Sequence, residues 1–145
     1  MRMVKKVEIY KKTKRYTQKY LEIAKCWSEL SYANRKKVGC IIVKDGSIIS
    51  DGYNGTPKGF ENDCEDLFGK TKWYVMHAEA NAILKLSKSN NSSIGSTLYT
   101  TLSPCKDCAK LILQADIKKV YYTEKYKDTT GIDFLESNGI SCINL

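Results

Sequence analysis

The sequence lacks any long apolar segment, and no run of hydrophobic residues approaches the roughly 18 that a transmembrane helix requires. Its first six residues, Met-Arg-Met-Val-Lys-Lys, contain no apolar core of a secretory signal. Internal repeats and low-complexity stretches are also missing. We therefore expect neither a membrane span nor a secretory signal. A length of 145 residues suits a single domain with a substantial core.

Six cysteines would allow three disulfide bonds, but the composition gives no need for them. With 42% hydrophobic residues, the chain can bury a core without covalent cross-links. We therefore expect a reducing compartment. Cys26, Cys40, Cys64 and Cys142 have no paired metal-ligand spacing, so we interpret them as buried or incidental thiols.

The net charge of +8 is concentrated at the N-terminus. Residues 1–20 contain eight basic residues and one acidic residue, whereas residues 21–145 contain sixteen basic and fifteen acidic residues. An arm that binds phosphate or nucleic acid would explain this pattern. A solvated, partly frayed terminus explains it equally well, and we adopt that interpretation. We therefore divide the chain into a basic arm, residues 1–12, and a single domain, residues 13–145.

Hydrophobic spacing predicts alternating helices and strands. Residues 13–32 have helical spacing and are expected to pack on the core through Tyr16, Tyr20, Ile23, Ala24, Trp27 and Leu30. Residues 38–43 and 47–53 flank an Asp-Gly turn and predict a β-hairpin. A helix from His77, a strand at 96–102, a helix at 104–115, a strand at 118–123, a helix at 130–138 and a strand at 140–145 follow.

This order predicts an α/β fold. The hairpin implies antiparallel pairing, and the later strand–helix alternation implies parallel pairing. We expect a three-layer α/β/α arrangement in which helices cover both faces of a mixed five-stranded sheet. The long connection from residue 54 to residue 77 is interpreted as part of a pocket wall, because loops of this length in compact domains usually have a function.

Two short segments, residues 77–79 and 104–108, contain the reactive side chains. Helix formers follow His77, so His77 and Glu79 are expected in a first helical turn. Pro104 suits the first position of another helix, which places Cys105 and Cys108 on one face of its first turn. The positive ends of the two helices favour thiolate and carboxylate groups.

His77, the only histidine, and the two cysteines form a set of three metal ligands. Structural zinc usually has four protein ligands, whereas catalytic zinc keeps one position for water. Glu79 lies two residues beyond the histidine and is placed to move protons without binding the metal. The pattern His-x-Glu followed by Pro-Cys-x-x-Cys is the signature of zinc-dependent nucleobase deaminases.

The sequence resembles the cytidine deaminase superfamily, and within it the deoxycytidylate deaminases, from about Tyr16 onward. The segments that carry this resemblance are Val38–Val43, Gly52–Pro57, His77–Ile83, Thr101–Cys108 and Tyr126–Asp128. The resemblance implies a cytidine deaminase-like fold and a homo-oligomer. It also implies hydrolytic deamination of dCMP to dUMP and ammonia, supplying dUMP for thymidylate synthesis.

The resemblance also implies roles for individual residues. Zn²⁺ would be held by His77, Cys105 and Cys108, with Glu79 as the proton shuttle. The substrate would be bound by the Asn54 side chain at the sugar and by the Ala78 backbone N–H at the cytosine carbonyl. Arg35, Lys125 and Tyr126 are candidate substrate contacts apart from the resemblance, and a solvated surface position is the alternative for each charged residue. Lys37, Lys58 and Lys127 are further candidates for phosphate contacts.

Other functions are compatible with the sequence. The enzyme could act on dCTP as well, or it could be a polynucleotide or tRNA-editing deaminase, which would explain the basic arm. A structural zinc module that binds nucleic acid would need a fourth ligand. A thiol–disulfide oxidoreductase would use the Cys-x-x-Cys pair but would leave His77 and Glu79 without a role.

Overall fold

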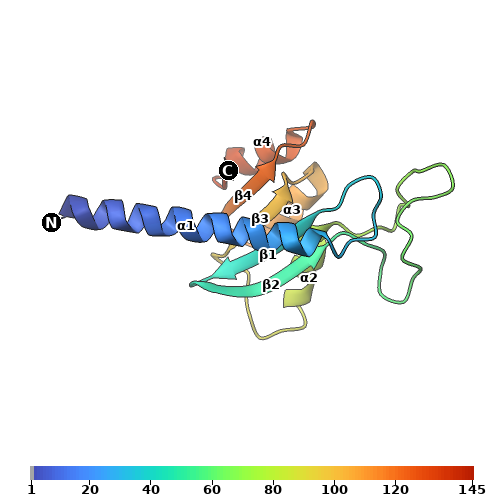
Figure 1. Cartoon of the computed structure of the whole chain (residues 1–145), viewed down its shortest axis with the longest axis horizontal. Coiled ribbons are helices and arrows are strands. Elements are labelled where there is room, and N and C mark those ends of the chain that lie inside the picture. Colours follow the sequence, from blue (N-terminus) through green and yellow to red (C-terminus); the bar gives the residue numbers. More distant parts are fainter. Residues whose placement is uncertain (1) are drawn as a thin grey trace.

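The computed structural model describes residues 2–145, and its elements follow the predicted order (Figure 1). The helices are α1 (Arg2–Ser28), α2 (Ala78–Leu86), α3 (Lys106–Gln114) and α4 (Thr130–Ser137). The strands are β1 (Gly39–Lys44), β2 (Ser47–Tyr53), β3 (Thr97–Leu102), β4 (Lys119–Glu124) and β5 (Ser141–Asn144). No helix within this described range is long and apolar enough to cross a lipid bilayer.

The five strands form one mixed sheet in the order β2-β1-β3-β4-β5. β1 pairs antiparallel with both β2 and β3, whereas β3, β4 and β5 run parallel. Asp45 and Gly46 both have positive φ, 50° and 77°, so the tight turn between β1 and β2 uses the left-handed backbone that Asp-Gly favours. The predicted mixed five-stranded sheet is confirmed.

Helices cover both faces of the sheet, as a three-layer α/β/α fold requires. The larger core lies between the sheet and α2, α3 and α4, and it includes Ile42, Leu98, Ile112, Val120 and Leu135. The smaller core lies under α1, where Leu21 packs with Ile41, Val43, Tyr99 and Tyr121. Alternate residues of β1 therefore enter opposite cores, because successive side chains of a strand point to opposite faces.

The face of α1 that packs on the sheet differs in large part from the predicted one. Of the six residues expected in the core, Ala24 is buried and Tyr20 is half-buried against the smaller core, whereas Tyr16, Ile23, Trp27 and Leu30 are exposed. The buried face is formed instead by Thr17, Leu21, Ala24 and Ser28.

Gly39 in β1 explains this choice of face. A Cβ atom added to Gly39 would lie 1.9 Å from the Ala24 carbonyl oxygen and 2.6 Å from the Ser28 nitrogen. Helix and strand therefore meet backbone to backbone, and only small residues fit between them. At this contact α1 presents Ala24 and Ser28 to the strand, whereas Tyr16, Ile23 and Trp27 remain exposed.

α1 also begins earlier than predicted and runs through the basic arm without a break at residue 12. Its N-terminal half projects beyond the sheet (Figure 1). Thr17 is the first of its described side chains to be buried. The division into an arm, residues 1–12, and a domain, residues 13–145, stays a prediction.

We expect deletion of residues 1–12 to change the free energy of unfolding by no more than about 1 kcal/mol, because the side chains described there, at residues 5–8, 11 and 12, are exposed and contribute little. Leu21→Ala is the contrasting variant, since it truncates a buried side chain and should cost about 2–5 kcal/mol. Urea denaturation measures both. A deletion as costly as Leu21→Ala, with a dependence on protein concentration, would show that the arm packs in an assembly.

Residues 54–77 form the long connection that the sequence predicts. Two isolated bridges give it order: Gly55 pairs with Met76 at its base, and Glu65 pairs with Thr71 near its tip. Leu67, Phe68 and Trp73 are almost fully exposed on it. The base of the connection leads directly to His77 at the start of α2.

Candidate active site

The predicted metal ligands lie at the starts of two helices. His77 is the N-cap of α2, and Cys105 is the N-cap of α3, with Cys108 in the first turn of α3. The prediction that Pro104 opens this helix is wrong by two positions. Cys105 has an extended backbone, with ψ of 170°, so the helix begins only at Lys106.

Two glycines allow neighbouring backbone to pack closely against the starts of these helices. A Cβ atom added to Gly52 in β2 would lie 2.4 Å from the Ala78 carbonyl oxygen. A Cβ atom added to Gly131 in α4 would lie 2.2 Å from the Pro104 carbonyl oxygen and 2.8 Å from the Cys105 carbonyl carbon. Because contacts below 3.0 Å are not tolerated at Cβ, only glycine allows the backbones to approach this closely.

The three ligand atoms converge on one point. His77 Nδ1 lies 3.3 Å from Cys108 Sγ and 3.5 Å from Cys105 Sγ, and all three ligand atoms lie within 4.8 Å of one another. Ligands of a tetrahedral zinc with bonds of about 2.0–2.3 Å are separated by roughly 3.5 Å. The donor set of one imidazole and two thiols therefore fits Zn²⁺. Among the described residues, His77, Cys105 and Cys108 are the group of potential metal ligands whose side chains converge.

Without a cation, the two thiols and the imidazole stabilise one another by sharing protons in hydrogen bonds. A bound cation would take the place of these protons. The pKa of Cys105 is lowered to about 4 because the Cys108 thiol and His77 stabilise its thiolate through hydrogen bonds. The same hydrogen bond, together with burial, raises the pKa of Cys108. The hydrogen bond to Cys105 also raises the pKa of His77. A zinc ion binds the deprotonated forms of these ligands.

Glu79 is a buried carboxylate beside the metal ligands, with only 4% of its surface exposed. Burial raises its pKa, because a low-dielectric environment disfavours the charged form. The hydroxyl of Thr100 lies 3.1 Å from Glu79 Oε1 and 3.0 Å from the Leu102 carbonyl oxygen. The carboxylate is therefore both desolvated and held in one orientation.

A cavity of about 320 Å³ opens in front of these groups. Of the predicted site residues, it is lined by Arg35, Asn54, His77, Ala78, Glu79, Cys105 and Tyr126. Cys108 lies behind this lining and is 2% exposed. Lys125 is not among the lining residues of the described chain, whereas its neighbour Tyr126 is, held by a 2.7 Å hydrogen bond from its backbone N–H to Ser103 Oγ.

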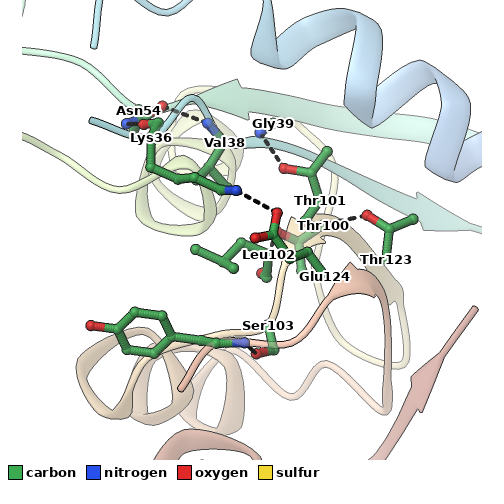
Figure 2. A network of polar contacts seen from close by, with 11 residues as sticks. Lys36, Val38, Gly39, Asn54, Thr100, Thr101, Leu102, Ser103, Thr123 and Glu124 are labelled. Atoms are coloured by element: carbon green, nitrogen blue, oxygen red, sulfur yellow. Dashed lines mark hydrogen bonds and ion pairs between the residues drawn. The ribbon is translucent and has the colours of Figure 1, made fainter. Parts of the chain in front are cut away.

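Asn54 has a role that the sequence did not indicate. Its Oδ1 accepts a hydrogen bond from the Val38 backbone N–H at 2.8 Å, and its Nδ2 donates to the Lys36 carbonyl oxygen at 2.8 Å (Figure 2). The side chain therefore fixes the segment before β1 as well as facing the cavity. Lys36 also forms an ion pair with Glu124 (Figure 2).

Sequence reasoning did not identify Lys36, Glu65 or Thr100 at the site. Lys36 and Glu65 line the cavity, and Thr100 contacts Glu79 from the neighbouring strand. Strand alternation could have placed Thr100 on the same face as Leu98, toward α2. No local pattern distinguishes Glu65 from the other acids of its loop.

The fold and the site together define a zinc-dependent deaminase. Residues 12–124 match the family model described as the cytidine and deoxycytidylate deaminase zinc-binding region. The chain belongs to this family, and its cofactor is Zn²⁺.

Individual relatives agree with this assignment. The chain is 36% identical to the deoxycytidylate deaminase of Enterobacteria phage T4, over 86% of this chain and 87% of that protein. It is 35% identical to the deoxycytidylate deaminase of Homo sapiens, over 76% of this chain and 66% of that protein. The crystal structure of the cyanophage S-TIM5 dCMP deaminase in complex with dCMP and dUMP matches with a TM-score of 0.88 and 46% identity, covering 90% of this chain and 97% of that one.

Proposed function

We propose that this protein hydrolyses dCMP to dUMP and ammonia, and so supplies dUMP for thymidylate synthesis. The observation that carries the proposal is a buried carboxylate beside a three-ligand zinc site in a cavity of about 320 Å³. That volume is at the lower end of the range for small-molecule sites, which suits one mononucleotide. The dCMP and dUMP bound in the cyanophage relative support the choice of base and sugar.

Zinc, when bound, supplies a Lewis acid that lowers the pKa of water from about 15.7 toward roughly 7. Glu79 accepts the proton of the water that attacks C4 of cytosine, and it delivers a proton to N3. Glu79 then takes the proton of the new C4 hydroxyl and delivers it to the amino group. The C4–N bond breaks, ammonia leaves and a carbonyl remains at C4. A carboxylate that holds a proton between steps benefits from the raised pKa that burial gives Glu79.

Other lining groups are proposed to bind the nucleotide. His77 makes no side-chain capping hydrogen bond at the start of α2, so it leaves the first-turn N–H groups, including that of Ala78, for a cytosine carbonyl. Asn54 is proposed to contact the sugar and Tyr126 to cover the nucleotide. Arg35 and Lys36 are the Arg and Lys residues that line the cavity, so the phosphate is proposed to bind beside them.

One assay tests this proposal against the alternatives. Ammonia release would be measured from dCMP, dCTP, CMP, deoxycytidine, single-stranded DNA and tRNA, together with zinc content. We expect dCMP to have the highest kcat/KM and zinc to be present at about one per chain. Preference for dCTP or a polynucleotide would redirect the substrate assignment. Zinc without ammonia from any substrate would instead support a structural module.

For Asn54→Ala we expect zinc to be retained and kcat/KM for dCMP to fall sharply, because a sugar contact is lost. The variant should also lose about 1–3 kcal/mol of stability, since the Val38 N–H loses its hydrogen-bond partner. Steady-state kinetics and urea denaturation measure the two effects. Unchanged kcat/KM in a destabilised variant would assign Asn54 to the fold alone.

We also propose that the protein is a homo-oligomer. The support is the outward face of α1, where Tyr16, Ile23 and Trp27 are between 36% and 51% exposed. A second copy of the chain would bury this face. Light scattering coupled to size exclusion should report an assembly that Tyr16→Ser and Ile23→Ser together disrupt, with Ile48→Ser in the hairpin as the exposed control. A monomeric wild type would refute this.

The cysteines support a reducing compartment. All six are free, including Cys40 and Cys64 in the interior and Cys26 at the surface. The proposed substrate belongs to the nucleotide pool of the same compartment. We therefore propose a cytoplasmic location, which microscopy of a fluorescently tagged chain would test.

A further inference from the structure

The segment before β1 forms the wall of the cavity that contains Arg35 and Lys36. It has no regular secondary structure, so side chains from elsewhere hold its backbone. Asn54 holds the C-terminal part through Lys36 and Val38. A different residue holds the N-terminal part, and that residue is Glu65.

Glu65 binds the backbone of this segment through a single carboxylate oxygen. Its Oε1 accepts hydrogen bonds from the backbone N–H groups of Asn34 at 2.8 Å and Arg35 at 3.0 Å. The other oxygen, Oε2, is buried and has no hydrogen-bond partner within residues 2–145. Oε1 therefore accepts both hydrogen bonds that fix the Asn34–Arg35 backbone, and Oε2 makes no contribution to this anchoring.

Glu65 can act as an anchor because its own loop is fixed. Its neighbour Cys64 is 1% exposed and accepts a 2.8 Å backbone hydrogen bond from Lys72. Glu65 itself forms an antiparallel bridge with Thr71. The loop that carries Glu65 and the segment that carries Arg35 are thus joined into one continuous wall of the cavity.

The charges of this wall indicate what the anchoring achieves. Lys36 is paired with Glu124, whereas Arg35 has no ion pair in the described chain. Arg35 is therefore the lining cation that remains for an anionic ligand. A guanidinium binds phosphate through a fork of donors whose direction depends on the position of its backbone.

We infer that Glu65 is a positioning residue that presents Arg35 to the 5′-phosphate of the substrate. The inference rests on the proposed function. It adds that the anchoring of Arg35 by Glu65 makes a nucleotide, rather than a nucleoside, the preferred ligand. Glu65 acts through the Asn34 and Arg35 backbone and touches no reacting atom. Its removal should weaken phosphate recognition and leave the chemistry at Glu79 intact.

The test compares two substrates that differ only in the phosphate. For Glu65→Ala we expect KM for dCMP to rise about ten- to a hundredfold, the scale of a lost charge-assisted contact. We expect kcat for dCMP and kcat/KM for deoxycytidine to change little. Arg35→Ala should show the same pattern, and combining the two substitutions should add little, because both remove one interaction.

Glu65→Gln separates anchoring from charge. The amide oxygen can accept the same two N–H groups, and the NH₂ group takes the place of Oε2. We expect this variant to bind dCMP at least as tightly as the wild type, because a negative charge leaves the phosphate site. Asp63→Asn removes a charge from the same loop, outside the cavity lining, and should change nothing. If Glu65→Ala aggregates, Glu65→Asp replaces it, since the shorter side chain cannot reach both N–H groups.

Equal losses on dCMP and deoxycytidine, or additive effects of Glu65→Ala and Arg35→Ala, would overturn the inference. A loss in Glu65→Gln as large as in Glu65→Ala would do the same. Failure of the proposed function has a different signature, namely a zinc-loaded wild type that releases no ammonia from dCMP. In that case calorimetric binding of dUMP and deoxyuridine supplies the same comparison, and a wild type without preference for dUMP refutes the role of Glu65.

Discussion

Glu79→Gln is expected to lower kcat for dCMP by about 10²–10⁴-fold or more, the contribution of a positioned acid–base group. Glutamine preserves the size of the side chain and can still accept the hydrogen bond from Thr100. It cannot take the proton of water or hold it for N3 and the amino group. The loss could exceed the usual range, because one carboxylate serves several proton transfers.

Zinc content and dUMP affinity should stay at wild-type levels in this variant, since Glu79 is not among the converging ligand atoms. Atomic emission and calorimetry provide these measurements. The control is Glu29→Gln, which makes the same chemical change at an exposed position. Loss of zinc in Glu79→Gln would make Glu79 a ligand and close the open coordination position. Retention of both zinc and turnover would require another group to move the protons.

Substitution of any metal ligand should abolish both zinc binding and turnover. Cys105→Ser and Cys108→Ser replace soft thiolates with hydroxyls that bind zinc poorly, and His77→Ala removes the imidazole altogether. Because the ligands join the starts of α2 and α3, loss of the ion should also lower the melting temperature. Metal analysis, ammonia release and calorimetry would measure the three effects.

The other cysteines provide matched controls for this experiment. Cys26→Ser lies on the exposed surface of α1, and Cys142→Ser lies in β5, away from the ligand cluster. Both should keep zinc and activity. A fully active protein without metal would contradict the zinc mechanism. Activity lost with zinc retained would instead place the affected cysteine in substrate binding.

The sequence predicts most of the fold because its signals are local. β2 begins and ends at the predicted residues, and the Asp-Gly turn has the expected positive φ values. The candidate metal ligands His77, Cys105 and Cys108 could be proposed in the same way, since their residue types and spacing are visible in the chain, and the fold brings them together. The other strands and the later helices differ from prediction by one or two residues at most, as at Pro104, because the conformation of Cys105 decides where α3 begins. The first helix differs far more, since α1 spans Arg2–Ser28 and not residues 13–32.

The features that sequence reasoning missed are tertiary. The buried face of α1 follows from the absence of a side chain at Gly39, a residue in a different element. Glu65 acts on backbone groups 30 and 31 residues away, so no spacing rule points to it. Pocket walls built from irregular segments depend on such contacts. They become visible only when the chain is folded.

The glycine contacts at the two helix starts have a consequence for how this protein tolerates change. Gly52 and Gly131 touch backbone atoms, so a new side chain at either position cannot be absorbed by rotation of a flexible neighbour. In a saturation mutagenesis experiment, these two positions should reject nearly every substitution while lying outside the ligand set. The exposed loop positions Leu67 and Phe68, much larger residues, should accept most of them. At these two positions, the close approach of neighbouring backbone therefore limits substitution more than the chemistry of the site does.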